Sequence, residues 1–340
     1  MSPLYVLIIA GGRGTRFWPR SRRALPKQCM SVDGERTLIQ ATLDRVGSRV
    51  PIERVVVVTS ATMAPALASQ LPGLPARNLM VEPQGRNTAP AVAWGCAEIA
   101  RRDPDAVVAV LPADHLVTRP EELIRALDAA REAAVQTGAL VTIGLQPTRP
   151  ETGFGYLKTG KGAGDFGGLP VLEVERFVEK PQLEAAQRYL ADGGYLWNAG
   201  MFVFTVAALQ RAVERHLPKL AQGLAQLAAE PQRLDEIYPT LPSISLDVGV
   251  MERAAAVLTV PADLGWSDVG SWDALGGHLP EQSFGAGLVR HGLAVDASDN
   301  LVHAPDKLVA LVGVQGLVVV DTGDALMVCR REDAQRVREL

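Results

Sequence analysis

The amino-acid sequence predicts an α/β protein with a mostly parallel, mixed sheet flanked by helices, followed by a small C-terminal all-β domain. Short runs rich in Val, Ile and Leu alternate with helical patterns over about the first 150 residues. Extended, glycine-rich segments then replace this alternation. After about Pro280, short apolar runs are separated by Asp, Asn and Gly, which is typical of small β domains.

The strands of the first part are expected where apolar runs are too short for helices. These runs cover residues 4–10, 54–59, 79–82, 106–111 and 140–145. One helix is expected over 89–102, with Thr88 as its N-cap, and another over 121–136, between Pro120 and Gly138. This order implies right-handed crossovers and a Rossmann-like sheet, which binds ligands at the carboxyl ends of its strands.

The second part is expected to extend the main domain rather than to fold separately. Helices are predicted at 182–191 and 206–215, within a mixed region that lies across the carboxyl edge of the sheet. We therefore predict one domain over 1–280, with halves at about 1–150 and 151–280, and a β domain over 281–340. The apolar runs of the β domain suggest stacked turns of strand, such as a short β-helix, although their period is irregular.

Composition and charge exclude several classes of partner. The chain has 340 residues, 47% of them hydrophobic, and a net charge of -4, so we expect no general affinity for nucleic acid or anionic membranes. No apolar run approaches the thickness of a bilayer. Cys29, Cys96 and Cys329 lack the close spacing of zinc or redox motifs and are read as buried thiols of a reducing compartment. A cytoplasmic location is expected.

The stretch from Val6 to Gln28, "VLIIAGGRGTRFWPRSRRALPKQ", combines a strand, a glycine-rich turn and local positive charge. Gly11, Gly12 and Gly14 directly follow the strand, so backbone N–H groups can face an anion such as a phosphate chain. A purely structural turn fits the glycines almost as well. A dinucleotide fingerprint would continue into a helix, and a Walker motif would close with Lys-Ser or Lys-Thr; neither occurs here.

This stretch resembles the signature of the sugar-phosphate nucleotidyltransferases, in the variant found in mannose-1-phosphate guanylyltransferases. Further blocks resemble that family in its order. They are "EPQGRNTAPA", "LPADH", "ETGFGY", "FVEKP", "WNAGMF", "SISLDVGVMERA" and "LGWSDVGSWDAL". Such an ordered set is far more specific than any single block.

The resemblance implies transfer of GMP from GTP to α-D-mannose 1-phosphate, with GDP-mannose and pyrophosphate as products. It also implies Mg²⁺ as cofactor and a homodimer. Another sugar 1-phosphate and nucleotide pair is one alternative. A regulator that binds nucleotide sugar without turnover is another alternative. Such a regulator is expected to lack at least one catalytic residue, and this sequence retains them all. A nicotinamide-dependent oxidoreductase is disfavoured, because no acidic residue ends the second strand.

The resemblance also implies roles for individual residues. The catalytic residues are expected to be Arg16 and Lys27. The nucleotide is expected to contact Gly11, Gly12, Gly14, Thr15, Arg86, Asn87 and Asp114. The sugar phosphate is expected to contact Gly155, Glu179, Lys180 and Asn198. Asp114 and Asp268, from distant segments, would hold Mg²⁺, which prefers oxygen ligands and bridges phosphates.

Simpler structural roles are assigned to several neighbours of these residues. Arg20 and Arg23 are interpreted as a solvated basic face. Trp197 and Phe202 are predicted to be core residues. In a regular strand Glu179 and the next residue would point to opposite faces, so both can reach one pocket only if the chain kinks or bulges there.

Overall fold

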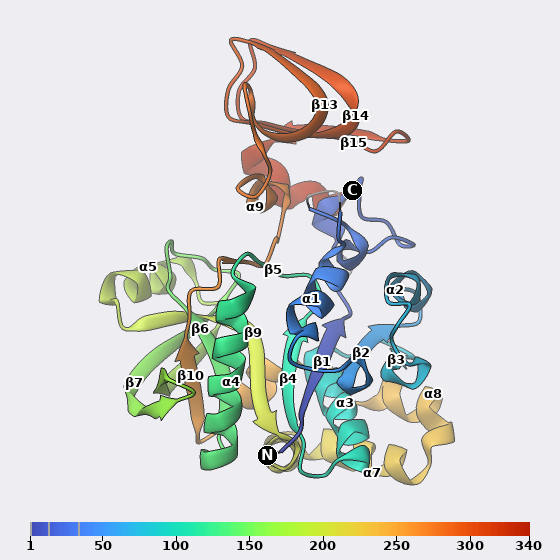
Figure 1. Ribbon diagram of the computed structural model, residues 1–340, viewed down its shortest axis with the longest axis vertical. Helices are drawn as coiled ribbons and strands as arrows, with labels where there is room; N and C mark the ends of the chain where they lie inside the picture. Colours follow the sequence, from blue (N-terminus) through green and yellow to red (C-terminus); the bar gives the residue numbers. More distant parts are fainter. Residues whose placement is uncertain (1, 13, 33–34) are drawn as a thin grey trace.

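The computed structural model describes residues 2–12, 14–32 and 35–340. A large α/β domain carries a β domain on top of one edge, and the C-terminus returns to the junction between them (Figure 1). In the described part of the chain the main sheet has nine strands in the order β3-β2-β1-β4-β9-β6-β10-β8-β7. Their bounds are β1 Leu4–Ala10, β2 Val55–Ser60, β3 Leu79–Glu82, β4 Val107–Pro112, β6 Leu140–Leu145, β7 Gly155–Phe166, β8 Leu169–Glu179, β9 Tyr195–Thr205 and β10 Val257–Pro261.

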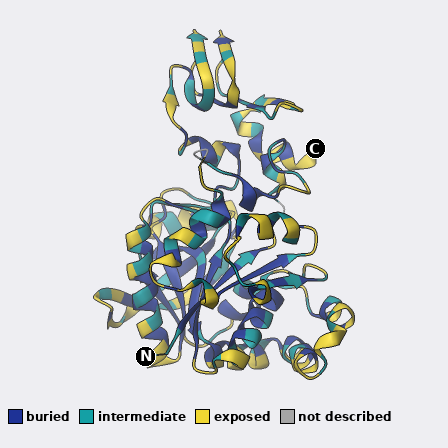
Figure 2. Cartoon of the chain, turned by 45° about the vertical axis from the view of Figure 1, so that its right-hand side comes forward, coloured by how far each residue is buried: buried dark blue, intermediate teal, exposed yellow. Residues whose placement is uncertain are grey.

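The helices cover both faces of this sheet. They are α1 Leu38–Gly47, α2 Ala64–Gln70, α3 Thr88–Arg102, α4 Pro120–Thr137, α5 Leu183–Asp192, α6 Val206–His216, α7 Pro218–Ala229 and α8 Leu234–Ile237. The short helix α9 Trp272–Gly276 lies instead at the junction with the β domain (Figure 1). Alternate side chains of β1 enter opposite cores, as the pleat requires. Val6 and Ile8 pack with α1, α2 and α4, whereas Tyr5 and Leu7 pack with α3, α6 and α7. The sheet is therefore buried on both sides (Figure 2).

The predicted α/β alternation is confirmed, and the expected runs at 4–10, 79–82 and 140–145 coincide with β1, β3 and β6. The sheet is mixed because β8 and β9 run against the other strands. β9 enters between β4 and β6 and separates two groups of parallel strands. The N-cap prediction at Thr88 is wrong. Asn87 is the cap residue of α3, and its side chain accepts from the Thr88 N–H.

The C-terminal domain is all-β, as predicted, apart from the final 3₁₀ helix η8 (Arg331–Glu339). Its strands are β12 Glu281–Gln282, β13 Gly285–Val295, β14 Asn300–Val312, β15 Leu317–Asp321 and β16 Leu326–Arg330. β13 pairs with β14 and β14 with β15 in parallel, although only short turns connect them. Parallel pairing of consecutive strands without a helix requires the chain to coil, so these strands stack as turns of a short β-helix.

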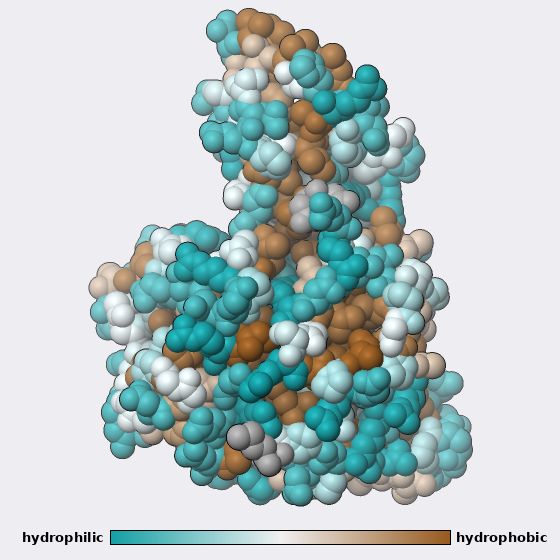
Figure 3. All heavy atoms as spheres, viewed as in Figure 1, coloured by the Kyte–Doolittle hydropathy of each residue, from teal (hydrophilic) through white to brown (hydrophobic). Residues whose placement is uncertain are grey.

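Hydrophobic side chains also lie on the surface of this domain. Figure 3 shows hydrophobic atoms running along the face that it displays. The large hydrophobic side chains that are exposed on these strands are Leu293, Val295, Leu308, Val312, Leu326 and Val328. Exposed patches of this kind are common at interaction surfaces. The homodimer stays a prediction.

The β domain packs directly on the N-terminal basic segment. Arg20 Nη1 lies 2.9 Å from His303 Nε2, and Arg22 pairs with Asp324 at 3.0 Å. The interpretation of Arg20 as part of a solvated face is therefore wrong, because it is half-buried against the β domain. Arg23 is exposed, as expected. Two of the N-terminal arginines thus connect domains.

A shared hydrophobic cluster joins the two domains around Trp272. Its ring is fully buried and lies 5.3 Å from Phe17 and 5.4 Å from His303, between ring centroids. Its indole N–H donates to the Trp18 carbonyl at 3.2 Å. The cluster also contains Val318 and other side chains of the β domain. The N-terminal turn and the C-terminal domain therefore share one core.

Trp272→Ala is expected to lower the free energy of unfolding by about 3–5 kcal/mol, because it leaves a large cavity in this shared core. Denaturant unfolding followed by circular dichroism measures the change. Leu326→Ala serves as control, since Leu326 is 62% exposed and such surface changes stay within about 0.5 kcal/mol. Equal stability losses in the two variants would show that Trp272 does not hold the domains together.

The described residues include no helix that is both long and apolar enough to cross a membrane. The three cysteines carry free thiols. Cys29 and Cys96 are buried as predicted, and burial raises the pKa of the Cys29 thiol to about 11. Cys329 is partly exposed, so its prediction as a buried thiol is wrong; it lies on the antiparallel strand β16 near the edge of the β domain.

Candidate active site

A cavity of about 470 Å³ opens at the carboxyl ends of the parallel strands, where ligands of such sheets bind. It takes residues from both halves of the main domain. Among the predicted site residues, those that line it are Gly11, Gly12, Asn87, Asp114, Gly155, Glu179, Lys180, Asn198 and Asp268. One cavity therefore holds the predicted nucleotide contacts beside the predicted sugar-phosphate contacts.

The glycines of the turn after β1 have two structural roles: some line the cavity and one allows close packing. Gly11 and Gly12 line the cavity directly after β1. Gly14 does not line it and has a positive φ of 61°. A Cβ atom on Gly14 would lie 2.3 Å from Lys27 Cβ, so only glycine lets the turn approach Lys27 this closely. Gly14 therefore supports Lys27, and its contact with nucleotide stays a prediction.

Thr15, Arg16 and Arg86 lie outside the lining of the cavity. Thr15 and Arg16 belong to the 3₁₀ turn η1 (Thr15–Phe17). The Nε–H groups of Arg16 and Arg86 are buried without a hydrogen-bond partner among the described residues. Unpaired buried donors are costly, and an anion that reached them would satisfy them. Arg13, which contributes to the basic stretch, lies outside the described residues.

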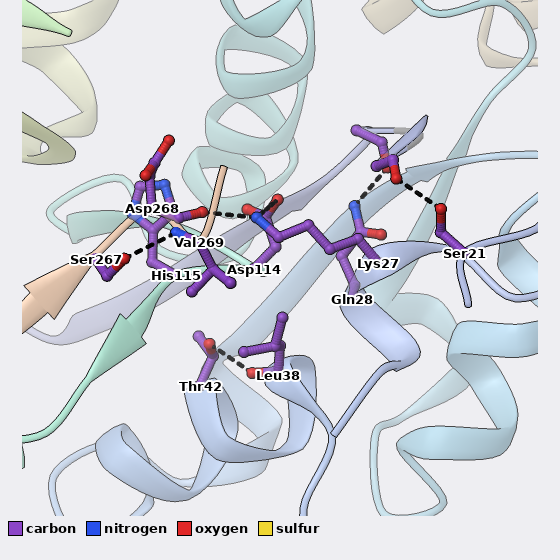
Figure 4. Close-up of polar contacts among 12 residues, drawn as sticks. Ser21, Lys27, Gln28, Leu38, Thr42, Asp114, His115, Ser267, Asp268 and Val269 are labelled. Atoms are coloured by element: carbon purple, nitrogen blue, oxygen red, sulfur yellow. Dashed lines mark hydrogen bonds and ion pairs between the residues drawn. The ribbon is translucent and has the colours of Figure 1, made fainter. Parts of the chain in front are cut away.

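Lys27, in η2 (Lys27–Cys29), does not line the cavity itself, but its side chain contacts two residues that do. Its ammonium group donates to Asp114 Oδ2 at 3.0 Å and to the backbone carbonyl of Asp268 at 2.6 Å (Figure 4). It also lies 5.7 Å from the ring centre of Phe17. The side chain is almost fully buried. Since an ammonium group has three N–H donors, one is left over after these two bonds.

Asp114 and Asp268 both line the cavity although they lie 154 positions apart in sequence. Asp114 follows β4, and Asp268 follows the short strand β11 (Trp266–Ser267), which pairs with β5 (Leu116–Val117). Burial favours the neutral form of Asp114, but the charge of Lys27, the nearby His115 and the hydrogen bond from Lys27 together outweigh burial and lower the Asp114 pKa. Burial raises the pKa of Asp268, and the Asp114 charge adds to this rise. The two carboxylates therefore interact.

These two residues could hold a divalent cation. Among residues 2–12, 14–32 and 35–340, no group of three or more His, Cys, Asp or Glu is arranged to bind a metal ion. A site built by two interacting carboxylates fits Mg²⁺, because Mg²⁺ keeps several waters and completes its shell with substrate phosphates. Burial is the main cause of the raised Asp268 pKa, and a cation would offset the smaller contribution that comes from repulsion by Asp114.

The end of the cavity predicted to bind the sugar phosphate is formed by the kinked end of β8. Lys180 has a φ of +47°, so the chain turns there and both Glu179 and Lys180 line the cavity, which confirms the kink. Their side chains pair at 3.0 Å. A Cβ atom on Gly155 would lie 2.7 Å from Glu179 Oε2, so the glycine leaves room for the carboxylate. Asn198 is 7% exposed and lines the same end.

Trp197 and Phe202, predicted as core residues, are 5% and 4% exposed. Phe202 also forms part of the cavity wall.

Three titratable residues that line the cavity were missed by sequence reasoning. Glu82 ends β3 and accepts from Tyr238 Oη at 2.6 Å; burial raises the Glu82 pKa. His115 Nδ1 accepts from the Trp266 indole N–H at 3.1 Å, and burial lowers the His115 pKa to about 4. Asp247 contacts Asn198. All three lie in blocks that carry the family resemblance, which was the available signal.

Comparison with known proteins agrees with this geometry. The family description "Nucleotidyl transferase" matches residues 5–279, and "MannoseP isomerase/GMP-like beta-helix domain" matches residues 291–340. The chain belongs to the nucleotidyl transferase family. The two matches correspond to the two parts of the structure: the first covers the α/β domain, and the second covers most of the β domain.

Relatives of this nucleotidyl transferase match it over its whole length. Xanthan biosynthesis protein XanB of Xanthomonas campestris pv. campestris (strain B100) is 39% identical over 351 residues, covering 100% of this chain and 73% of that protein. The mannose-1-phosphate guanylyltransferase of Escherichia coli (strain K12) is 38% identical with the same coverages.

A crystal structure described as mannose-1-phosphate geranyltransferase from Thermus thermophilus has 38% identity and a TM-score of 0.89. The matched region covers 99% of this chain and 97% of the Thermus thermophilus chain.

Proposed function

We propose that this nucleotidyl transferase transfers GMP from GTP to α-D-mannose 1-phosphate, giving GDP-mannose and pyrophosphate. One observation carries the proposal: a single cavity joins the glycine turn after β1 to the Glu179–Lys180 kink. This arrangement suits a nucleotide and a sugar phosphate that lie next to each other. The names of the full-length relatives support the choice of GTP and mannose 1-phosphate.

The two substrates would occupy opposite ends of this cavity. Gly11, Gly12 and Asn87 line the end that would receive the nucleotide. Arg16 and Arg86 lie outside the lining and would contribute their unpaired Nε–H donors. Lys180 would neutralise the phosphate of the sugar. Glu179 can only accept hydrogen bonds when ionised, so it suits sugar hydroxyl groups rather than phosphate. Gly155 and the remaining N–H of Asn198 complete this end.

The reaction requires no covalent nucleophile from the protein. A phosphate oxygen of mannose 1-phosphate forms a bond to the α-phosphorus of GTP, and the bond between this phosphorus and the α,β-bridging oxygen breaks. The electron pair leaves with pyrophosphate. Both reactants are anions, so the protein must reduce their repulsion and stabilise the charge that develops. Lys27 would donate to the α-phosphoryl oxygens, and Arg16 would contact the outer phosphates.

The family generally uses a divalent metal, and we propose that this metal is Mg²⁺ held by Asp114 and Asp268. A divalent ion held there would supply positive charge that offsets the charge of the nucleotide phosphates. Lys27 would keep Asp114 ionised and oriented, since it donates to Oδ2 and lowers the pKa of this carboxyl group. The carbonyl contact from Lys27 fixes the backbone at Asp268.

The proposal is tested by measuring pyrophosphate release with Mg²⁺ while GTP, ATP, UTP and dTTP are each combined with mannose 1-phosphate and glucose 1-phosphate. We expect strong preference for GTP with mannose 1-phosphate. Preference for another pair would retain the reaction and change the substrates. No release with any pair, together with binding of GDP-mannose, would favour the alternative of a regulator without turnover.

A further inference from the structure

The segment between α8 and β10 contains a feature that the residue roles above do not use. Residues Asp247–Met251 form the π-helical turn η7. π-Helical turns are rare in proteins overall. Those that do occur are often found at functional sites. Here the first residue of the turn, Asp247, lines the active-site cavity beside Glu179, Lys180 and Asn198.

Several contacts hold η7 in place. The backbone N–H of Leu246 donates to Thr88 Oγ1 at 2.8 Å, which ties the start of η7 to the start of α3. The backbone N–H of Glu179 donates to Glu252 Oε1 at 2.8 Å, which ties the end of the turn to β8. The turn is thus fixed between the nucleotide end and the sugar-phosphate end of the cavity.

Asn198 orients the Asp247 carboxylate. Its Nδ2 donates to Asp247 Oδ1 at 2.9 Å. Its Oδ1 accepts from Thr142 Oγ1 at 2.7 Å and from the Gly200 N–H at 3.1 Å, so the amide cannot turn without losing these bonds. One Asp247 oxygen is therefore held by Asn198, and the residue remains partly exposed to the cavity.

The carboxylates of Asp247 and Glu179 lie near each other in the cavity, which is an unfavourable arrangement for an aspartate with only a structural role. Reduced solvation and the nearby charge of Glu179 raise the Asp247 pKa to about 6, although Lys180 and Asn198 oppose this rise. Lys180 pairs with Glu179 and not with Asp247. Two carboxylates beside one cation would repel a phosphate, whereas they readily accept hydrogen bonds from neutral hydroxyl groups.

We propose that Asp247 is a sugar-binding residue whose carboxylate accepts hydrogen bonds from hydroxyl groups of the sugar, and that Asn198 is its positioning residue. This inference rests on the proposed function and adds a determinant of sugar choice to it. Glu179 and Asp247 approach the cavity from different elements, so together they can distinguish the directions of two hydroxyl groups. Lys180 remains for the sugar phosphate.

The test compares wild-type protein with Asp247→Asn, which keeps an acceptor for Asn198 Nδ2 and removes the charge. Affinities for GDP and GDP-mannose are measured by calorimetry, and KM is measured separately for GTP and mannose 1-phosphate. We expect a loss on the order of tenfold to a hundredfold in GDP-mannose affinity, with a matching rise in KM for mannose 1-phosphate. GDP affinity and KM for GTP should change by less than about twofold.

A purely structural role would weaken both nucleotide and sugar binding or lower stability alone. Asp235→Asn makes the same chemical change at an exposed position of α8 outside the cavity and serves as control. If Asp247→Asn does not fold, Asp247→Ser carries the same measurements, because its hydroxyl group can still accept from Asn198.

The inference is overturned if GDP-mannose affinity in the folded variant stays within about twofold of wild type, or if GDP affinity falls equally. The absence of GDP-mannose binding by wild-type protein overturns it as well. The proposed function fails separately, when wild-type protein binds GDP-mannose but does not form it from GTP and mannose 1-phosphate.

Discussion

Lys27→Ala is expected to lower kcat by about 10²–10³-fold, with a smaller change in the KM values. In the proposed reaction Lys27 would supply charge to the transferring phosphoryl group, and it contacts Asp114 and the backbone at Asp268. Alanine keeps the Cβ atom that packs on Gly14, so the fold should survive. Initial rates of pyrophosphate release, measured at saturating concentrations of both substrates, give the change in kcat.

Lys161→Ala is the matched control for this variant. The Lys161 side chain is 78% exposed and lies 3.5 Å from Glu173, in a surface pair that contributes little. The control should retain wild-type kcat. A near-normal kcat in Lys27→Ala, with an unchanged circular dichroism spectrum, would remove Lys27 from the mechanism.

Asp268→Asn is expected to raise the Mg²⁺ concentration for half-maximal activity by about tenfold or more. Loss of a partner outside the ligand shell already costs about 10–100-fold in metal affinity, and loss of a ligand should cost at least as much. The substitution keeps the backbone carbonyl that accepts from Lys27, so the contact that fixes this lysine remains. Activity is titrated with Mg²⁺ at constant GTP.

Asp263→Asn provides the control, because Asp263 lies close in sequence but its exposed side chain pairs with Arg119. Its titration should match wild type. If Asp268→Asn gives the wild-type titration as well, Asp268 is not a ligand of the metal.

Much of the sheet could be predicted because parallel strands buried on both faces appear as continuous apolar runs. The end of α4 was predictable from Gly138, which adopts the left-handed conformation at its C-cap. The insertion of β9 between β4 and β6 was not predictable in this way. It depends on pairing with partners far away in sequence, and nothing in residues 195–205 indicates which strands they join.

In the candidate site, too, residues in local sequence motifs could be predicted, whereas contacts between distant segments could not. The glycines, Lys27 and the aspartates were proposed from motifs, and the structure brings Lys27, Asp114 and Asp268 together. Arg20 was misinterpreted because its partner, His303, lies in the other domain. Asp247 was missed because a π-helical turn has no simple spacing of apolar residues, and its contact with Asn198 exists only after folding.

The central claim is transfer of a GMP group, and radiolabelled GTP tests it most directly. The full-length protein is incubated with Mg²⁺, mannose 1-phosphate and GTP labelled at either the α- or the γ-phosphorus. The account predicts that the α label appears in GDP-mannose and the γ label in pyrophosphate. Release of the γ label as inorganic phosphate, or its transfer to the sugar phosphate, would contradict the account, because another bond of GTP would then be broken.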